Sequence, residues 1–275
     1  MFPVEEKLDE IRAVLSSNAS LVLSAPPGSG KTTCVAPALL NESFLEGKKI
    51  IMLEPRRLAA RMCAEYISSR LGEKVGGTVG YQVRLERKVS SSTRLEILTE
   101  GLLVQRMLTD MELTDVGLVI FDEFHERSLA CDFALALVLE IKKVFRPDLR
   151  IAVMSATLDA DAALSVLPNA KFVQAEGRMF PVETRHIGEI PMERAVVRAL
   201  KETDGDILCF LPGEGEIRKT MEALDGIDAK VLPLFGALPK EVQDQVFKPV
   251  QKRKVILATS IAETSLTIPG IKCVI

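Results

Sequence analysis

A loop of small residues between an apolar run and a lysine constrains the fold more than any other feature. Residues 21–33 read LVLSAPPGSGKTT, an expected strand, the loop and the start of an expected helix. Gly28 and Gly30 allow the backbone N–H groups of the loop to curl around phosphate oxygens, and the helix N-terminus adds the positive end of its dipole. This order predicts a phosphate site in an α/β fold with a parallel sheet.

Two side chains of the loop have the chemistry for a nucleoside triphosphate with magnesium. Lys31 can reach the β- and γ-phosphates, and the Thr32 hydroxyl can ligate Mg²⁺. The motif usually opens with Gly where this sequence has Ala25, a mild change because both later glycines remain. The alternative is an ordinary glycine-rich turn, against which the combination of strand, loop, Lys-Thr pair and helix argues.

A second motif places two carboxylates at the end of an apolar run. Residues 119–127 read VIFDEFHER, so Asp122 and Glu123 follow an expected strand, where ligands of open α/β sheets bind. In nucleotide hydrolysis one carboxylate orients Mg²⁺ and another polarises the attacking water, and Asp122 suits the first task and Glu123 the second. Alone, the motif could be a charged strand-to-helix turn, and His125 could be a packing or surface histidine.

Apolar, β-branched runs alternate with helical stretches along the chain. Strands are expected at residues 21–25, 49–53, 94–98, 117–121, 150–154, 206–211, 230–233, 254–258 and 272–275, and helices at 58–71, 129–144, 193–202 and 214–223. This alternation predicts parallel sheets with helices on both faces. Gly177 and Pro181 interrupt regular structure, which predicts a boundary between a first unit of residues 1–177 and a second of 178–275.

The composition argues against several other classes of protein. The sequence contains no run of about 18 or more apolar residues, so no membrane span is predicted. The acidic N-terminus lacks the basic and then apolar segments of a signal peptide. The five cysteines are dispersed and only two histidines are present, which argues against a zinc site or a disulfide framework. We therefore expect a cytoplasmic protein without membrane contact. The chain ends inside an apolar, strand-like run, from which we expect a fragment of a longer protein.

With these motifs the chain resembles superfamily 2 helicases of the DEAH/RNA-helicase-A group. Its DEFH sequence at 122–125 is a DExH box, followed by ERS at 126–128. The Phe within the box, together with LEPRRLAAR at 53–61, most resembles the bacterial HrpB-type members. Further motifs follow in family order: TEGLL at 99–103, SAT at 155–157, FLPG at 210–213 and ATSIAETSLTI at 258–268.

The resemblance implies an ATP-dependent RNA helicase built from two tandem RecA-like domains of the P-loop NTPase class, the second incomplete. It implies ATP and Mg²⁺ as cofactors, with ATP between the domains and single-stranded RNA across both. Carried over by motif, Lys31, Asp122 and Glu123 are catalytic, and Thr32, Asp122 and Glu123 hold the metal. ATP contacts fall to Pro27, Gly28, Ser29, Gly30, Lys31, Thr32 and Thr33.

The resemblance also assigns residues to coupling and to RNA. His125, Ser155 and Thr157 would couple hydrolysis to domain motion. RNA contacts fall to Arg56, Arg57, Thr99, Glu100, Gly101, Thr259, Ser260 and Thr264, although family members usually carry Asn in place of Ser260. The family clamps adenine between an Arg and a Phe, and the matching positions are Tyr66 and Phe247. Alternatively, Tyr66 packs on its own helix and Phe247 fills the core.

The charge distribution bears on the expected RNA contact. The chain has a net charge of −3, but residues 56–94 hold nine Lys and Arg against three acids, a local net charge of +6. A basic surface is what phosphate contact requires, although a solvated basic face is the alternative for individual residues. Few aromatics and no tryptophan argue against extensive base stacking, so we expect backbone tracking without sequence readout.

Other activities remain compatible with parts of the sequence. A regulatory ATPase without unwinding would keep the phosphate loop, and the backbone-contacting motifs do not separate RNA from DNA. A P-loop kinase or transporter ATPase does not need the SAT motif or the second α/β unit.

No Gln-Arg-x-Gly-Arg pattern occurs, so the family's arginine finger, which contributes about 10³–10⁵ in rate, is missing. We therefore expect this chain to bind nucleotide weakly and to hydrolyse it poorly. Protein partners are not predicted.

Overall fold

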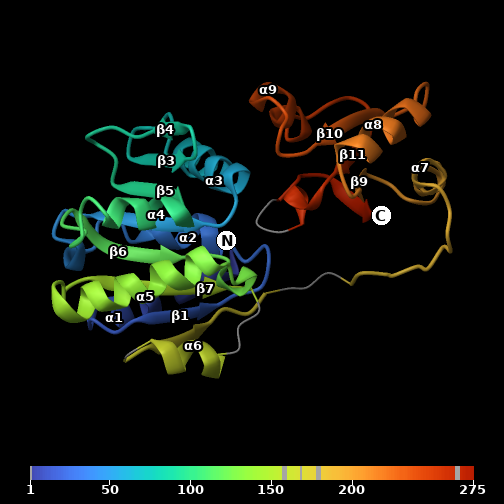
Figure 1. Ribbon diagram of the computed structural model, residues 1–275. Helices are drawn as coiled ribbons and strands as arrows, with labels where there is room; N and C mark the ends of the chain where they lie inside the picture. The colour runs from blue at the N-terminus through green and yellow to red at the C-terminus, as the bar shows by residue number, and fades with distance from the viewer. Residues whose placement is uncertain (1, 157–159, 168, 178–180, 264–266) are drawn as a thin grey trace. The chain divides into compact units, whose positions relative to one another are not determined.

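Parallel strands form the centre of both parts of the chain in the computed structural model, which describes residues 2–156, 160–167, 169–177, 181–263 and 267–275 (Figure 1). The chain divides into two compact units, Met1–Phe180 and Pro181–Ile275. The predicted α/β class with parallel sheets is confirmed in each unit. No helix among the described residues is long and apolar enough to cross a membrane.

The first unit contains a sheet that has eight strands among the described residues, in the order β4-β3-β5-β2-β6-β7-β1-β8. Every neighbouring pair is parallel except β3 and β4. The strands are β1 Leu21–Ser24, β2 Lys49–Glu54, β3 Val79–Val83, β4 Glu86–Lys88, β5 Leu95–Thr99, β6 Val116–Phe121, β7 Arg150–Ser155 and β8 Lys171–Gln174.

Helices cover both faces of this sheet. They are α1 Leu8–Ser16, α2 Lys31–Ala38, α3 Arg57–Arg70, α4 Glu100–Met107, α5 Leu129–Val144 and α6 Ala160–Val166, with short 3-10 turns η1 Pro3–Lys7, η2 Ser43–Leu45 and η3 Phe124–Glu126. One core cluster joins the sheet to α1, α2 and α3. A second joins the opposite face to α4, α5 and α6.

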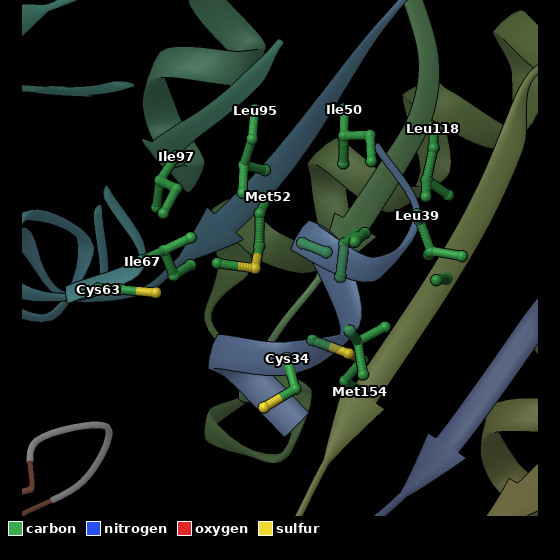
Figure 2. Packing of buried hydrophobic residues seen from close by; sticks show 14 of the residues in the cluster. Cys34, Leu39, Ile50, Met52, Cys63, Ile67, Leu95, Ile97, Leu118 and Met154 are labelled. Carbon is green, nitrogen blue, oxygen red and sulfur yellow. The ribbon is translucent and has the colours of Figure 1, made fainter. Parts of the chain in front are cut away.

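Strand β2 shows why the predicted runs are apolar throughout. Ile50 and Met52 lie in the first cluster, whereas Ile51 and Leu53 lie in the second, as alternation along a strand requires. Figure 2 shows Ile50 and Met52 in the same cluster as Leu118 of β6 and Leu39, which directly follows α2. Because both faces are buried, the strand has no polar face, and it is therefore a continuous apolar run in the sequence.

The second unit is built in the same way. Its sheet has four parallel strands among the described residues, in the order β10-β11-β9-β12. The elements are α7 Met192–Glu202, β9 Asp206–Phe210, α8 Glu214–Ala223, β10 Lys230–Leu234, α9 Lys240–Gln243, η4 Asp244–Val246, β11 Lys254–Ala258, η5 Ser260–Ala262 and β12 Ile271–Val274. The core that they share includes Val196, Ile207, Ile217 and Val255.

The predicted strands and helices are confirmed to within one residue at each end, but three strands were not predicted. Strand β3 escapes the pattern because Gly80 and Gln82 interrupt its apolar residues. Gly80 is needed there, since a Cβ at this position would lie 2.5 Å from the backbone oxygen of Lys88 in β4. Strands β4 and β8 are short and largely exposed edge strands, which carry little apolar signal.

Candidate nucleotide and nucleic-acid sites

The phosphate loop joins β1 to α2, as the sequence predicted. Gly28 and Gly30 have φ angles of +76° and +86°, a left-handed conformation that favours glycine. Ala25 is not among the residues with positive φ; it is buried, and its N–H donates to the Ser155 oxygen of β7 at 3.0 Å. The first position of the loop therefore requires no glycine here, which accounts for the departure from the usual motif.

The N-terminal segment packs against this loop, a contact that the sequence analysis missed. A Cβ on Gly30 would lie 2.7 Å from Cβ of Phe2, so glycine is also needed there for close approach. The Val4 N–H donates to the Ser29 oxygen at 3.1 Å, and the Arg70 guanidinium of α3 lies 5.8 Å from the centre of the Phe2 ring. Residues 2–4 therefore brace the loop from outside.

Four predicted site residues meet at the carboxyl ends of the strands. The Lys31 ammonium donates to Oε1 of Glu123 at 2.6 Å and lies 3.9 Å from Oδ1 of Asp122. The Thr32 hydroxyl donates to Oδ2 of Asp122, and the Glu123 N–H donates to Oδ1 of the same carboxylate at 2.8 Å. The sequence placed these residues about 90 positions apart in two motifs, and the sheet brings them into direct contact.

Burial and mutual charge shift the protonation equilibria of this group. Burial and the adjacent Asp122 raise the pKa of Glu123, in opposition to Lys31. Burial lowers the pKa of Lys31, but Asp122 and Glu123 outweigh it and leave the pKa above its usual value. Glu123 also has a φ of +50°, a left-handed conformation that is uncommon for a non-glycine residue.

A third carboxylate, Glu54, joins this group, although none of the sequence motifs assigns it a role. It is the last residue of β2, next to β6, and only 1% of its surface is exposed. Burial, Asp122 and Glu123 raise its pKa well above the usual value. A glutamate that ends an apolar strand immediately before Pro55 was the available signal, because the carboxyl ends of such strands bind ligands.

The donor set fits a magnesium ion. The Thr32 hydroxyl and the Asp122 carboxylate are hard oxygen donors in contact with each other beside the phosphate loop. Among the described residues no group of three His, Cys, Asp or Glu side chains could hold a metal on its own. This combination suits Mg²⁺, which commonly binds through one or two carboxylates, phosphate oxygens and several waters.

Two of the predicted coupling residues lie together beside Glu123. The His125 Nδ1 atom is 3.2 Å from Oγ of Ser155 and 3.5 Å from Oε2 of Glu123. Ser155 is fully buried at the end of β7. The third residue of this set, Thr157, lies outside the described residues.

The predicted RNA residues of the first unit divide into surface and interior positions. Arg57 and Gly101 are exposed, and Arg56 lies with its Nε atom 3.4 Å from Oε2 of Glu126 in η3. Thr99 is half-buried at the junction of β5 and α4. Glu100 is buried, and its carboxylate accepts a hydrogen bond from Ser128. Its side chain therefore faces the protein interior.

In the second unit the predicted residues lie after β11. Thr259 is half-buried, with its N–H donating to the Leu234 oxygen at 3.1 Å, and Ser260 is exposed in η5. Thr264 lies outside the described residues. Of the predicted adenine clamp, Tyr66 on α3 is 45% exposed, and Phe247 of the second unit is half-buried, so the clamp stays a prediction.

Comparison with known proteins gives a consistent result over the whole chain. The model of the family "DEAD/DEAH box helicase" matches residues 8–165, and that of "Helicase conserved C-terminal domain" matches residues 192–275. ATP-dependent RNA helicase HrpB of Escherichia coli (strain K12) is 46% identical over 99% of this chain and 35% of its own length. ATP-dependent RNA helicase HrpA of Borreliella burgdorferi is 38% identical over the same shares.

A crystal structure of Escherichia coli DEAH/RHA helicase HrpB matches all of this chain and 36% of that chain, with a TM-score of 0.89 and 45% identity. A second, of Escherichia coli DExH-box NTPase HrpB, matches with a TM-score of 0.78. The chain thus spans about a third of the length of these relatives.

Proposed function

Because this chain belongs to the DEAD/DEAH box helicase family, we propose that it forms the motor core of an HrpB-like helicase that couples ATP hydrolysis to movement along single-stranded RNA. The observation that carries the proposal is the meeting of Lys31, Thr32, Asp122 and Glu123 at the phosphate loop. These groups supply the charge, the metal donors and the base that phosphoryl transfer to water requires.

In this proposal each side chain has a separate task. The backbone of residues 27–33 and the Lys31 ammonium would hold the phosphates, and Thr32 and Asp122 would hold Mg²⁺, which would neutralise charge on the phosphate oxygens. Glu123 orients the attacking water and accepts its proton, and its raised pKa suits a general base. A γ-phosphate would compete with Glu123 for Lys31, which would free the Glu123 carboxylate for this task.

The RNA and coupling roles complete the proposal. We assign residues 1–177 to the ATP-binding domain and 178–275 to the C-terminal helicase domain. His125, which contacts both Ser155 and Glu123, would transmit the state of the ATP site. Basic and small surface residues at the starts of α3 and α4 would face the RNA backbone, with Glu100 acting from inside as a support for this surface.

The proposal is tested first by nucleotide binding. We expect Lys31→Ala to weaken binding of a fluorescent ATP analogue with Mg²⁺ by about 10- to 100-fold, because it removes a charge-assisted hydrogen bond to phosphate. Lys252→Ala, which removes an exposed lysine paired with Asp228, should leave the affinity unchanged. Equal binding by wild type and Lys31→Ala would refute the phosphate-loop assignment.

RNA binding and turnover distinguish this function from its alternatives. Arg57→Ala should weaken binding of single-stranded RNA of any sequence. It should also reduce the slope of log K against log salt concentration by about 0.7. Arg218→Ala, which removes an exposed arginine paired with Glu214, is the control. Turnover should be slow in this chain because it lacks the arginine-finger pattern. ATP binding without any RNA affinity would favour a regulatory ATPase, and tighter binding of matched DNA strands would favour a DNA helicase.

A further inference from the structure

Glu54 is a buried acidic side chain to which the proposed mechanism gives no task. Its Oε2 atom is buried and has no hydrogen-bond partner among the described residues. An unsatisfied buried polar atom costs about 1–3 kcal/mol, more when charged, so each one in a native structure calls for an explanation. The apolar character of the rest of β2 makes the glutamate at this position more conspicuous.

The register of the sheet places Glu54 at the proposed nucleotide site. Leu53 of β2 pairs with Phe121 of β6, so the next residues, Glu54 and Asp122, are neighbours at the carboxyl edge. The Asp122 N–H donates to the Leu53 oxygen at 3.1 Å, which fixes this arrangement beyond the end of β6. The carboxyl group of Glu54 lies within hydrogen-bonding and charge contact of Asp122.

The charge of the site points to a cation. When they are ionised, Asp122 and Glu123 carry two negative charges and Lys31 carries one positive charge, all of them buried. One negative charge is therefore left over, even before Glu54 is counted. Buried charges are stable only when they are paired, so the site is built for a cation in addition to Lys31.

We propose that Glu54 is a positioning residue of the nucleotide site, which anchors Asp122 and offers its free oxygen to the water shell of the nucleotide-bound Mg²⁺. This inference rests on the proposed nucleotide site and adds a residue to it. Mg²⁺ dehydrates reluctantly and keeps several waters, so acceptors beyond the direct ligands fix its position. Such outer residues typically change metal affinity by about 10- to 100-fold when they are removed.

The test measures how strongly Mg²⁺ tightens nucleotide binding. A fluorescent ADP analogue is titrated into the full 275-residue chain with Mg²⁺ and with EDTA. The dissociation constant in EDTA divided by that in Mg²⁺ is then compared between variants. Glu54→Leu should reduce this ratio by about 10- to 100-fold. Glu54→Gln should retain most of it, since an amide can donate to Asp122 and accept from water. Glu54→Met replaces the leucine variant if that one does not fold.

Thermal melting without nucleotide provides a second readout. Glu54→Leu should melt at a higher temperature than wild type, because it removes an unsatisfied buried carboxyl group, while its Mg²⁺ response falls. Wild-type Mg²⁺ dependence in the apolar variants would overturn the inference and leave the proposed function intact. A loss in Glu54→Gln equal to that in Glu54→Leu would also overturn it. Failure of the wild type to bind nucleotide would overturn the proposed function and this inference with it.

Discussion

At the scale of single residues, burial decides which charged groups are chemically unusual. Burial and the neighbouring Asp122 carboxylate raise the pKa of Glu123, although the buried Lys31 ammonium that the two carboxylates share lowers it. The ion pair between Arg218 and Glu214 interacts more weakly, because it is exposed and water screens its charges. The same residue types therefore have different chemistry according to the strand or helix that carries them.

Lys142 gives a prediction at the scale of one residue, away from the proposed nucleotide site. Burial and the nearby Arg150 lower its pKa to about 8, from 10.5. Between these two values the unfolded chain binds a proton that the folded chain does not, so this group makes the stability rise with pH. The free energy of unfolding of wild type minus that of Lys142→Met should therefore increase from pH 8 to pH 10.5. Urea unfolding measures it, with exposed Lys143→Met as the control, for which a flat difference is expected.

At the scale of elements, strand ends and helix starts are joined by side chains. Ser128 caps α5 by accepting a hydrogen bond from the Cys131 N–H at 2.9 Å, and its hydroxyl donates to Glu100 at the start of α4. Arg56 at the start of α3 contacts Glu126 in η3. The proposed RNA surface is thereby connected to the loop that carries Glu123.

Removal of the α5 cap tests this connection. Ser128→Ala should lower the free energy of unfolding by about 1–2 kcal/mol, since it removes an N-cap and the hydrogen-bond donor of buried Glu100. Ser17→Ala, at an exposed helix end, should change it by less than about 0.5 kcal/mol. Chemical denaturation measures both, and equal effects of the two substitutions would contradict the role of Ser128.

At the scale of the whole molecule, each unit has its own hydrophobic core. The residues of the described core clusters lie between Val4 and Ala175 in the first unit. In the second unit the buried residues of the cluster lie between Val196 and Leu257. Units with separate cores need not unfold in one cooperative step.

Calorimetry tests this separation. We expect the heat-capacity trace to require more than one transition, and Mg²⁺ with nucleotide at about 100 times the dissociation constant should stabilise the unit that carries the phosphate loop by about 2.7 kcal/mol. At the same ligand concentration, Lys31→Ala should reduce the shift to about 0.4–1.4 kcal/mol, because binding is 10- to 100-fold weaker, without merging the transitions. A single two-state transition with equal calorimetric and van't Hoff enthalpies would contradict the prediction.

The sequence alone determined the fold class, most elements and the residues of the phosphate loop and the DExH box, because these depend on local patterns. Strands buried on both faces are apolar throughout, and glycine is required where φ is positive, as at Gly28. Strand β3 and the edge strands lacked such a pattern, so only the sheet itself revealed them.

The tertiary structure alone decided which of these residues touch. That Glu54 lies beside Asp122 follows from the pairing of β2 with β6, and that Phe2 covers Gly30 follows from the docking of the N-terminal segment. Both are contacts between residues far apart in the chain, which no local pattern encodes. The physical reason is that strand order is set by the burial of whole faces, so neighbours at a strand end are determined only once the sheet has formed.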